Sequence, residues 1–176
     1  RLVGPYILRR MKTDKRITAV RESIEMVKRS SADKPLAYHG QVFKVYGFQP
    51  KYATDPAPLV YAGANREKML RASVAAGDGV MYSDMPRGLV QKMTDTVREA
   101  LQAADRPVEG YRISNIWAWH FKQDREAALH EARRELLLRG WLDTWYLESF
   151  LNAEESDFVT QNKGAFYKSY LSRTGV

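Results

Sequence analysis

The 176-residue sequence contains no cysteine, so disulfide bonds and thiolate metal sites are excluded. This absence also fits a reducing compartment, and we expect a cytoplasmic protein. No apolar run reaches the length of a membrane span and no secretory signal is present, so we expect no membrane partner. The three histidines do not join acidic residues at the spacing of a metal site, so we predict no metal.

Motifs that mark several enzyme classes are missing as well. The sequence has no GxSxG nucleophile elbow and no phosphate-binding GxxxxGK[ST] loop. No acid, base or nucleophile can be assigned from these patterns, and the catalytic residues stay unknown.

The charge is moderately basic, with 28 Lys and Arg against 21 Asp and Glu and a net charge of +7. Such a balance fits an acidic partner such as nucleic acid. The basic residues are nevertheless spread over several predicted helices and alternate with acidic ones, as in 131–135. Dispersed charge indicates a solvated surface. We therefore predict no nucleic-acid partner and keep nucleic-acid binding as the weaker alternative.

The pattern that organises the chain lies in residues 58–84. Apolar runs at 59–62 and 80–82 predict two buried strands. Apolar residues at helical spacing between them predict a helix of about three turns, with Asn65 as its N-cap and Gly77 as its C-cap. Strand, helix, strand is a βαβ unit, whose strands we expect to be parallel with a right-handed crossover.

This unit also offers a place for a ligand. In parallel α/β folds, the carboxyl ends of the strands and the N-termini of the following helices lie at one edge. We expect the amides of residues 63–66 to point outward there, beside the positive end of the helix dipole, where a phosphate fits. The alternative is that Gly63 only makes the turn.

Patterns elsewhere predict the remaining elements. They are a helix at 14–28, a hairpin with strands at 36–38 and 42–45, a helix at 88–104, a strand at 111–121 and a helix at 125–139. Gly40 sits in the hairpin turn, where a positive φ suits glycine, and His39 is expected to be exposed. Apolar residues on both faces of 111–121 predict a parallel strand covered on both sides. Asp124 is the expected N-cap of the helix after it.

Residues 141–176 form an aromatic-rich tail, in which we expect short helices that begin at Asn152 or Ser156. Aromatic stripes of this kind indicate a core or a subunit interface, so a homo-oligomer is expected.

The order and spacing of four segments resemble the luciferase-like flavin enzymes. They are Tyr38-His39-Gly40-x-x-Phe43, Pro58-Leu59-Val60-Tyr61-Ala62-Gly63-Ala64, Lys68-Met69-Leu70 and Gly77-Asp78-Gly79-Val80. Within that superfamily of monooxygenases and reductases, the sequence is most similar to the coenzyme F420-dependent methylenetetrahydromethanopterin reductase branch. The resemblance runs from about Arg9 to Arg139.

The resemblance implies a (β/α)8 (TIM) barrel, of which residues 1–176 would be part as a single α/β domain. The strands at 59–62, 79–83 and 112–120 would be strands five to seven. The hairpin would lie in an insertion at 29–57, and 141–176 would be an aromatic helical tail. Because three parallel strands cannot close a barrel of eight, the parent protein would be roughly twice as long, and the fragment alone would lack the activity.

The resemblance also implies a function, which is F420-dependent hydride transfer on a small-molecule substrate. FMN-dependent monooxygenation is the alternative within the superfamily, and a non-catalytic α/β interaction module is the alternative outside it. The residues implied for the phosphate side of the cofactor are Gly63, Ala64, Asn65, Arg66, Gly79, Val80 and Met81. Many relatives carry a second glycine or a serine-proline where this sequence has Asn65-Arg66. Because of this difference, the resemblance does not decide whether the cofactor is F420 or FMN.

Three further residues are weaker candidates at the same edge. His120, Ser83 and Asp84 lie at predicted strand ends, where barrel enzymes keep their functional groups. The alternative readings are a packing histidine for His120 and a capping residue for Asp84. His130 lies among charged residues of a helix and is expected to be solvated.

Overall fold

The computed structural model describes residues 15–52, 54, 56–138 and 144–174. The chain divides into two compact units, which are described separately: Arg1–Met85 with Val90–Ile116, and Pro86–Leu89 with Trp117–Val176. The elements are α2 (Arg16–Arg29), β1 (Leu36–His39), β2 (Lys44–Phe48), β3 (Tyr61–Gly63), α3 (Glu67–Ala76), β4 (Gly79–Ser83), α4 (Arg87–Ala103), β5 (Arg112–Ile116), α5 (Arg125–Leu138), α6 (Thr144–Leu147), α7 (Ala153–Gln161) and α8 (Lys163–Thr174). None of the helices in the described ranges is both long and apolar enough to cross a membrane.

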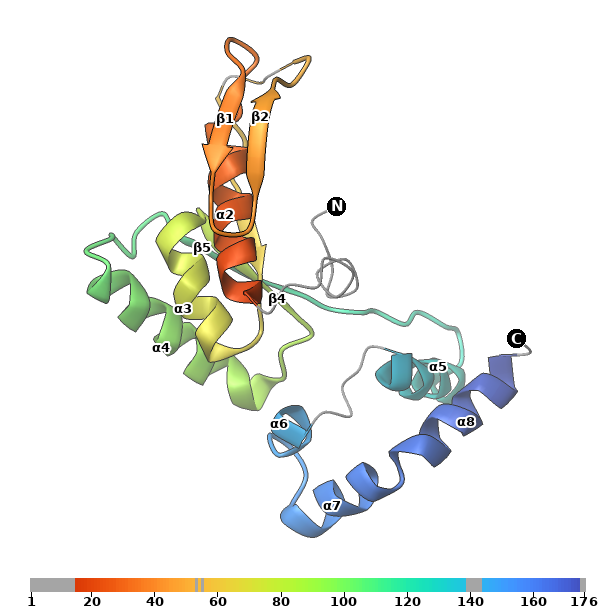
Figure 1. The fold of residues 1–176 in the computed structure, drawn as a ribbon. Coiled ribbons are helices and arrows are strands. Elements are labelled where there is room, and N and C mark those ends of the chain that lie inside the picture. The colour runs from red at the N-terminus through yellow and green to blue at the C-terminus, as the bar shows by residue number, and fades with distance from the viewer. Residues whose placement is uncertain (1–14, 53, 55, 139–143, 175–176) are drawn as a thin grey trace. The chain divides into compact units, whose positions relative to one another are not determined.

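The centre of the first unit is a three-stranded parallel sheet with the order β3-β4-β5 (Figure 1). α3 connects β3 to β4, and α4 connects β4 to β5, so the predicted parallel βαβ unit is confirmed and continues by one strand. The apolar stripes of both helices and the middle of β4 are buried, as the helical spacing predicted: Leu70, Val74, Val80, Tyr82, Val97 and Leu101. Among the described residues, no strand pairs with the outer edge of β3 or β5.

β5 is shorter than predicted. The sequence predicted a strand over 111–121, whereas β5 ends at Ile116. The last residue of β5, Ile116, pairs with Ser83, the last residue of β4. After Ser83 the chain turns at Asp84, which has a φ of 52°. Because β4 ends there, residues 117–121 have no strand to pair with in the described part of the chain. The expected cover on both faces was also wrong, since Trp117, Trp119 and Phe121 are 47%, 74% and 83% exposed.

The predicted hairpin is confirmed as the antiparallel pair β1–β2, with a register shift between Leu36 and Ala37. Leu36 and Tyr38 are buried, while His39 is exposed and packs edge-on against the ring of Tyr46 at 5.0 Å between centroids. The expected exposure of His39 is therefore confirmed. That the hairpin belongs to the insertion expected at 29–57 stays a prediction.

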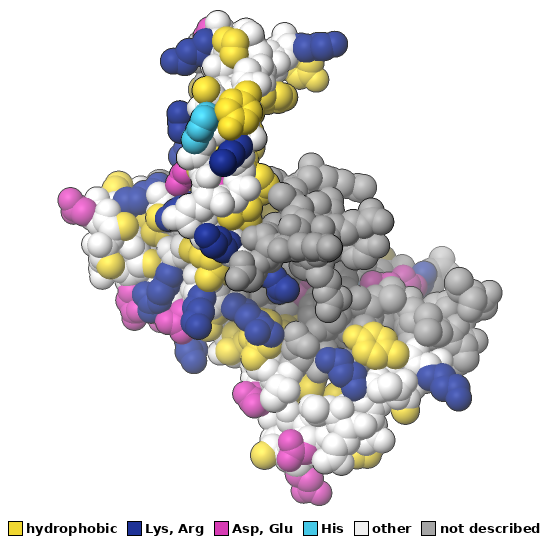
Figure 2. Space-filling model, in the orientation of Figure 1, with side chains coloured by type: hydrophobic (Ala, Val, Ile, Leu, Met, Phe, Trp, Pro, Cys, Tyr) yellow, Lys and Arg dark blue, Asp and Glu magenta, His cyan; other side chains and the backbone are white. Residues whose placement is uncertain are grey.

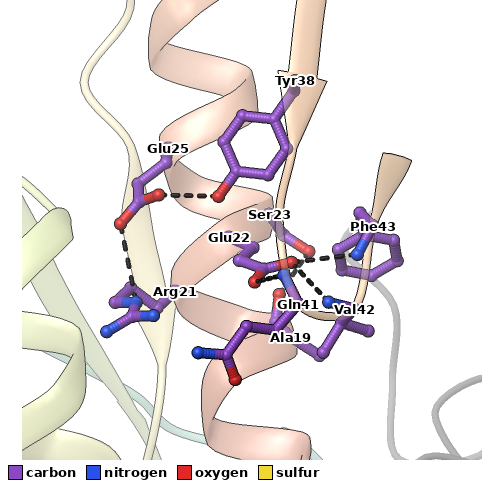
Figure 3. A network of polar contacts seen from close by, with 9 residues as sticks. All are labelled: Ala19, Arg21, Glu22, Ser23, Glu25, Tyr38, Gln41, Val42 and Phe43. Atoms are coloured by element: carbon purple, nitrogen blue, oxygen red, sulfur yellow. Dashed lines mark hydrogen bonds and ion pairs between the residues drawn. The ribbon is translucent and has the colours of Figure 1, made fainter. Parts of the chain in front are cut away.

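The turn of the hairpin is fastened to α2 by one buried carboxylate (Figure 3). Glu22 is 2% exposed and accepts hydrogen bonds from the backbone amides of Gln41, Val42 and Phe43 at 2.6, 3.0 and 2.9 Å. The expectation that Gly40 needs a positive φ was wrong, because among the described glycines only Gly47 and Gly110 have a positive φ. Gly40 is required for another reason: a Cβ there would overlap the Glu22 carboxylate.

The helix ends of the second unit largely follow the sequence. Asp124 caps α5, since its carboxylate accepts the amide of Ala127 at 2.8 Å. Asn152 caps α7 in a reciprocal pair with Glu155, whereas Ser156 lies buried inside that helix. His130 is exposed, as expected.

The described part of the aromatic tail is helical, as predicted. Tyr146 is buried and packs edge-on against Trp145 and Phe150, while Phe158 is 61% exposed. Trp141 lies outside the described residues. The expected homo-oligomer stays a prediction.

Candidate functional site

The carboxyl edge of the sheet is formed where β3 ends beside β4. Gly63 pairs with Met81, and the amide of Ala64 donates to the carbonyl of Met81 at 3.1 Å. The pairing therefore runs one residue beyond the end of β3. The amide of Ala64 is used in this bond, so the expectation that all the amides of residues 63–66 point outward was wrong at this position.

Asn65 has a different role from the predicted one. Its side-chain oxygen accepts the amide of Ser83 and its side-chain nitrogen donates to the carbonyl of Ser83, both at 2.9 Å. The N-cap position of α3 is Arg66, and no side chain caps that helix. Two bonds to a strand end satisfy more of the Asn65 amide than one cap bond would. The prediction of Asn65 as N-cap was therefore wrong, and Asn65 instead ties the β3–α3 loop to β4.

A second asparagine holds the other side of the β4 end. Asn115, in β5, accepts the amide of Met85 at 3.2 Å and donates to its carbonyl at 3.1 Å. Met85 is fully buried. Nothing in the sequence pattern singled out Asn115 as more than one residue of a strand. The signal was an asparagine inside an otherwise apolar strand, where a polar side chain needs a partner.

The weaker candidates at this edge have structural partners. Asp84 is 3% exposed, its amide donates to the carbonyl of Ile116 at 2.7 Å, and the Ser83 hydroxyl lies 3.1 Å from its carboxylate. These contacts join the ends of β4 and β5. His120 belongs to the second unit, where its Nδ1 lies 3.5 Å from Glu131 of α5.

The implied cofactor-binding residues fall into two groups along the strands. Gly63, Ala64, Asn65, Arg66 and Met81 lie at the carboxyl edge. Gly79 and Val80 lie at the other end of β4 and are buried. A Cβ on Gly79 would come within 2.5 Å of the Arg112 carbonyl and 2.7 Å of the Tyr61 ring. The close approach of β3 and β5 therefore accounts for this glycine on its own.

A hollow of about 370 Å³ opens beside the same loop. The first turns of α2 and α3 line it, and its residues are Lys15, Arg16, Ile17, Thr18, Arg66, Lys68 and Met69. We call this the cationic hollow, because four of the seven are basic and none is acidic. Lys and Arg side chains are also visible on the face that carries α2 and α3 (Figure 2).

The exposed lining of the cationic hollow is mostly apolar, so its fit to an anion depends on the basic residues and the helix starts. The N-terminus of a helix carries a partial positive charge, which is usually balanced by acidic residues or a capping side chain. Neither α2 nor α3 has a side-chain cap bond. The first turn of α2 has no acidic residue, whereas that of α3 has Glu67, which pairs with Arg71. A phosphate beside Arg66 and Lys68 would balance the positive ends of the helices.

Sequence reasoning found only Arg66 among these cations. Lys15 and Arg16 were missed because they lie at the start of α2, about 50 residues earlier in the chain than the loop. Lys68 lies in the first turn of α3 and was considered only as part of the family resemblance. The available signal was basic residues at a helix start, where acidic ones are the rule.

Comparison with known proteins identifies the family. A family model described as luciferase-like monooxygenase matches residues 5–173. The chain belongs to the luciferase-like monooxygenase family. This luciferase-like chain is 23% identical, over 120 residues, to the 5,10-methylenetetrahydromethanopterin reductase of Archaeoglobus fulgidus, and that match covers 68% of the chain and 36% of the relative. The predicted resemblance to this branch is confirmed.

A solved structure supports the fold. The coenzyme F420 dependent tetrahydromethanopterin reductase from Methanopyrus kandleri superposes with a TM-score of 0.69 at 17% identity, over 88% of this chain and 46% of that one. The luciferase-like chain therefore has a mixed α/β fold of the same kind as this relative. It spans less than half the length of both relatives.

Proposed function

We propose that this chain is part of a coenzyme F420-dependent oxidoreductase. In this proposal, β3, β4 and β5 are the fifth to seventh strands of a (β/α)8 barrel, and the remaining strands belong to a longer parent protein. The proposal is supported by the family and by the two reductases to which the chain is similar, one of which is described as coenzyme F420 dependent. The whole reaction, on a small-molecule substrate, would belong to that parent.

The observation that carries the proposal is the cationic hollow beside the Gly63–Arg66 loop. Its four cations and two uncapped helix starts fit an anionic group. A Cβ built on Gly63 meets nothing within 4 Å, so the loop backbone is open to an approaching ligand. Arg66 and Lys68 would hold the phosphate, and Asn65 would keep the loop in place through Ser83.

The bound deazaflavin would supply the chemistry, which is hydride transfer at its C5 atom. The residues of this chain would orient the cofactor rather than take part in bond making. FMN carries a phosphate as well, so the cationic hollow alone does not separate the two cofactors.

The test is removal of the charges. We expect the double variant Arg66→Ala/Lys68→Ala to bind F420 about 100-fold more weakly, at roughly tenfold for each lost charge-assisted contact. Arg71→Ala is the matched control, because Arg71 lies in the same helix, outside the hollow, and pairs with Glu67 and Glu99. Isothermal titration with F420 and with FMN gives both affinities.

Unchanged F420 affinity in the double variant, or an equal loss in Arg71→Ala, would contradict the assigned phosphate site. Tighter binding of FMN than of F420 would contradict the cofactor assignment and favour the FMN alternative.

A further inference from the structure

The cationic hollow has more room and more positive charge than one phosphate group needs. Its volume of about 370 Å³ lies within the range of small-molecule pockets, whereas a water molecule in the liquid occupies about 30 Å³ and a phosphate group is only a few times larger. Its cations come from two helix starts, with Arg66 and Lys68 at α3 and Lys15 and Arg16 at α2. The proposed phosphate contacts use only the α3 pair, so the α2 pair is left without an assigned ligand group.

The two helices that wall the hollow are fastened to each other without any ligand. Ile24 of α2 is buried in an apolar cluster against which Ala76 of α3 packs. At the opposite end from the hollow, Lys28 of α2 donates to the carboxylate of Asp78, just after α3, at 2.6 Å. These contacts hold α2 beside α3 (Figure 1). The backbone positions of both cation pairs are therefore set before a ligand binds, which lowers the cost of binding.

The rest of the lining indicates the kind of anion that fits. It consists of Ile17, Thr18 and Met69, and the exposed lining as a whole is mostly apolar. A mostly apolar pocket with a few charged groups suits a ligand that has aliphatic segments between its polar groups. A chain that carries several anionic groups, separated by methylene groups, matches this surface better than one compact ion does.

We propose that the cationic hollow binds the carboxylates of the glutamate tail of coenzyme F420 beside Lys15 and Arg16, next to its phosphate at Arg66 and Lys68. The inference rests on the proposed function and deepens it. In F420 the phosphate is followed by a lactyl group and glutamate residues, which supply aliphatic linkers and carboxylates, whereas FMN ends at its phosphate. As a site for phosphate, the hollow accepts either cofactor, and as a site for carboxylates it favours F420.

Two ligands that differ only in the tail test this inference. They are coenzyme F420 and its tail-free form, which lacks the glutamate residues, each titrated calorimetrically into the parent protein. We expect the parent protein to bind F420 about tenfold more tightly than the tail-free form, as two partly exposed ion pairs would produce. Lys15→Ala/Arg16→Ala should raise the Kd for F420 about tenfold and leave the Kd for the tail-free form nearly unchanged.

A second double variant of α2 controls for the change in net charge. Arg21→Ala/Arg29→Ala removes two cations that lie outside the hollow, where Arg21 pairs with Glu25 and Arg29 lies over the ring of Tyr38. It should bind F420 as the wild type does.

Thermal unfolding separates a ligand-binding role of the α2 pair from a structural one. Positive charges at a helix N-terminus are unfavourable for the helix. Lys15→Ala/Arg16→Ala should therefore keep or raise the Tm of the protein without ligand, although it weakens F420 binding.

The inference is overturned if the parent protein binds both forms equally, if Lys15→Ala/Arg16→Ala binds F420 as the wild type does, or if Arg21→Ala/Arg29→Ala loses as much. It is also overturned if Lys15→Ala/Arg16→Ala weakens both forms to the same extent, because the α2 pair would then act on the phosphate. Failure here is separable from failure of the phosphate site. Arg66→Ala/Lys68→Ala should weaken both forms, and that result would support the phosphate site whatever the tail does.

Discussion

Replacing Glu22 by Gln is expected to lower the free energy of unfolding by about 3 kcal/mol, although the two side chains have the same shape. The carboxylate accepts three backbone amides, one on Oε1 and two on Oε2. A glutamine has one acceptor oxygen, and its NH₂ group would face donors instead of accepting from them. With its oxygen at the Oε2 position, a glutamine loses the bond from Gln41, whose amide then faces the NH₂ group, and also loses the charge that strengthens the other two bonds. Bonds to a charged acceptor contribute about 1.5–3 kcal/mol each.

The acid dependence follows from the same contacts. Burial raises the pKa of Glu22, but the amides of Phe43, Gln41 and Val42, together with Arg21, outweigh burial and hold the pKa below its usual value of 4.5. A carboxyl group with a lowered pKa stabilises the fold above pH 4.5, and this stabilisation is lost as the pH falls through the lowered value. We expect Glu22→Gln to remove this part of the acid sensitivity.

Urea unfolding at pH 7 and at pH 4 measures both effects. Glu25→Gln is the control, because Glu25 lies on the same helix and accepts one hydrogen bond, from the Tyr38 hydroxyl at 2.7 Å, beside an exposed ion pair with Arg21 at 3.6 Å. Its loss should be below about 1 kcal/mol. A Glu22→Gln variant as stable as Glu25→Gln would show that the carboxylate does not fasten the hairpin.

Replacing Asn115 by Ala should cost about 3 kcal/mol of unfolding free energy. Both polar backbone groups of Met85 depend on this side chain, and Met85 is fully buried. A buried donor or acceptor left without a partner costs about 1–3 kcal/mol, and this variant leaves one of each. The carboxyl end of β4 should also loosen, and hydrogen exchange at Met85 would report that.

Asn65→Ala is the matched control for Asn115→Ala. Asn65 makes the same two bonds, but to Ser83, which is exposed and can bond to water after the change. We expect Asn65→Ala to cost about 1 kcal/mol in thermal or urea unfolding. Equal costs for the two variants would mean that burial of Met85 does not decide the effect.

The sequence predicted the parallel sheet well, because the information for it is local. Apolar runs of three to four residues, a glycine after the first and a striped helix between them specify β3, α3 and β4 within 25 residues. Gly77 ends α3 as predicted, although its φ of −82° and ψ of 165° are extended rather than left-handed. Glycine suits this position because a Cβ at residue 77 would come within 3.2–3.3 Å of three carbonyl oxygens.

The predictions that were wrong concern residues whose structure depends on a partner far away in the sequence. Asn65 has the local preference of an N-cap, but Ser83 lies opposite it once β3 and β4 pair. The apolar pattern of 111–121 continues past Ile116, but β4 has already ended at Ser83. Glu22 lies off the apolar stripe of its helix and suggests a solvated residue. It is buried because a hairpin turn 20 residues later folds over it.

One part of the candidate site could be predicted from local sequence and the other could not. The loop at Gly63–Arg66 could be found from the βαβ pattern, since every such unit places a helix start at that edge. The cationic hollow could not, because it needs the start of α2 to lie beside the start of α3. The tertiary packing of those two helices, and no local motif, brings Lys15 and Lys68 together.

Native mass spectrometry of the parent protein mixed with coenzyme F420 tests the central claim most directly. The account predicts that each parent chain retains one F420 molecule, and that excess inorganic phosphate reduces the bound fraction, because phosphate competes for the cationic hollow. A parent protein that retains no F420, or that retains it equally with and without excess phosphate, would contradict the proposal that this region holds the phosphate side of the cofactor.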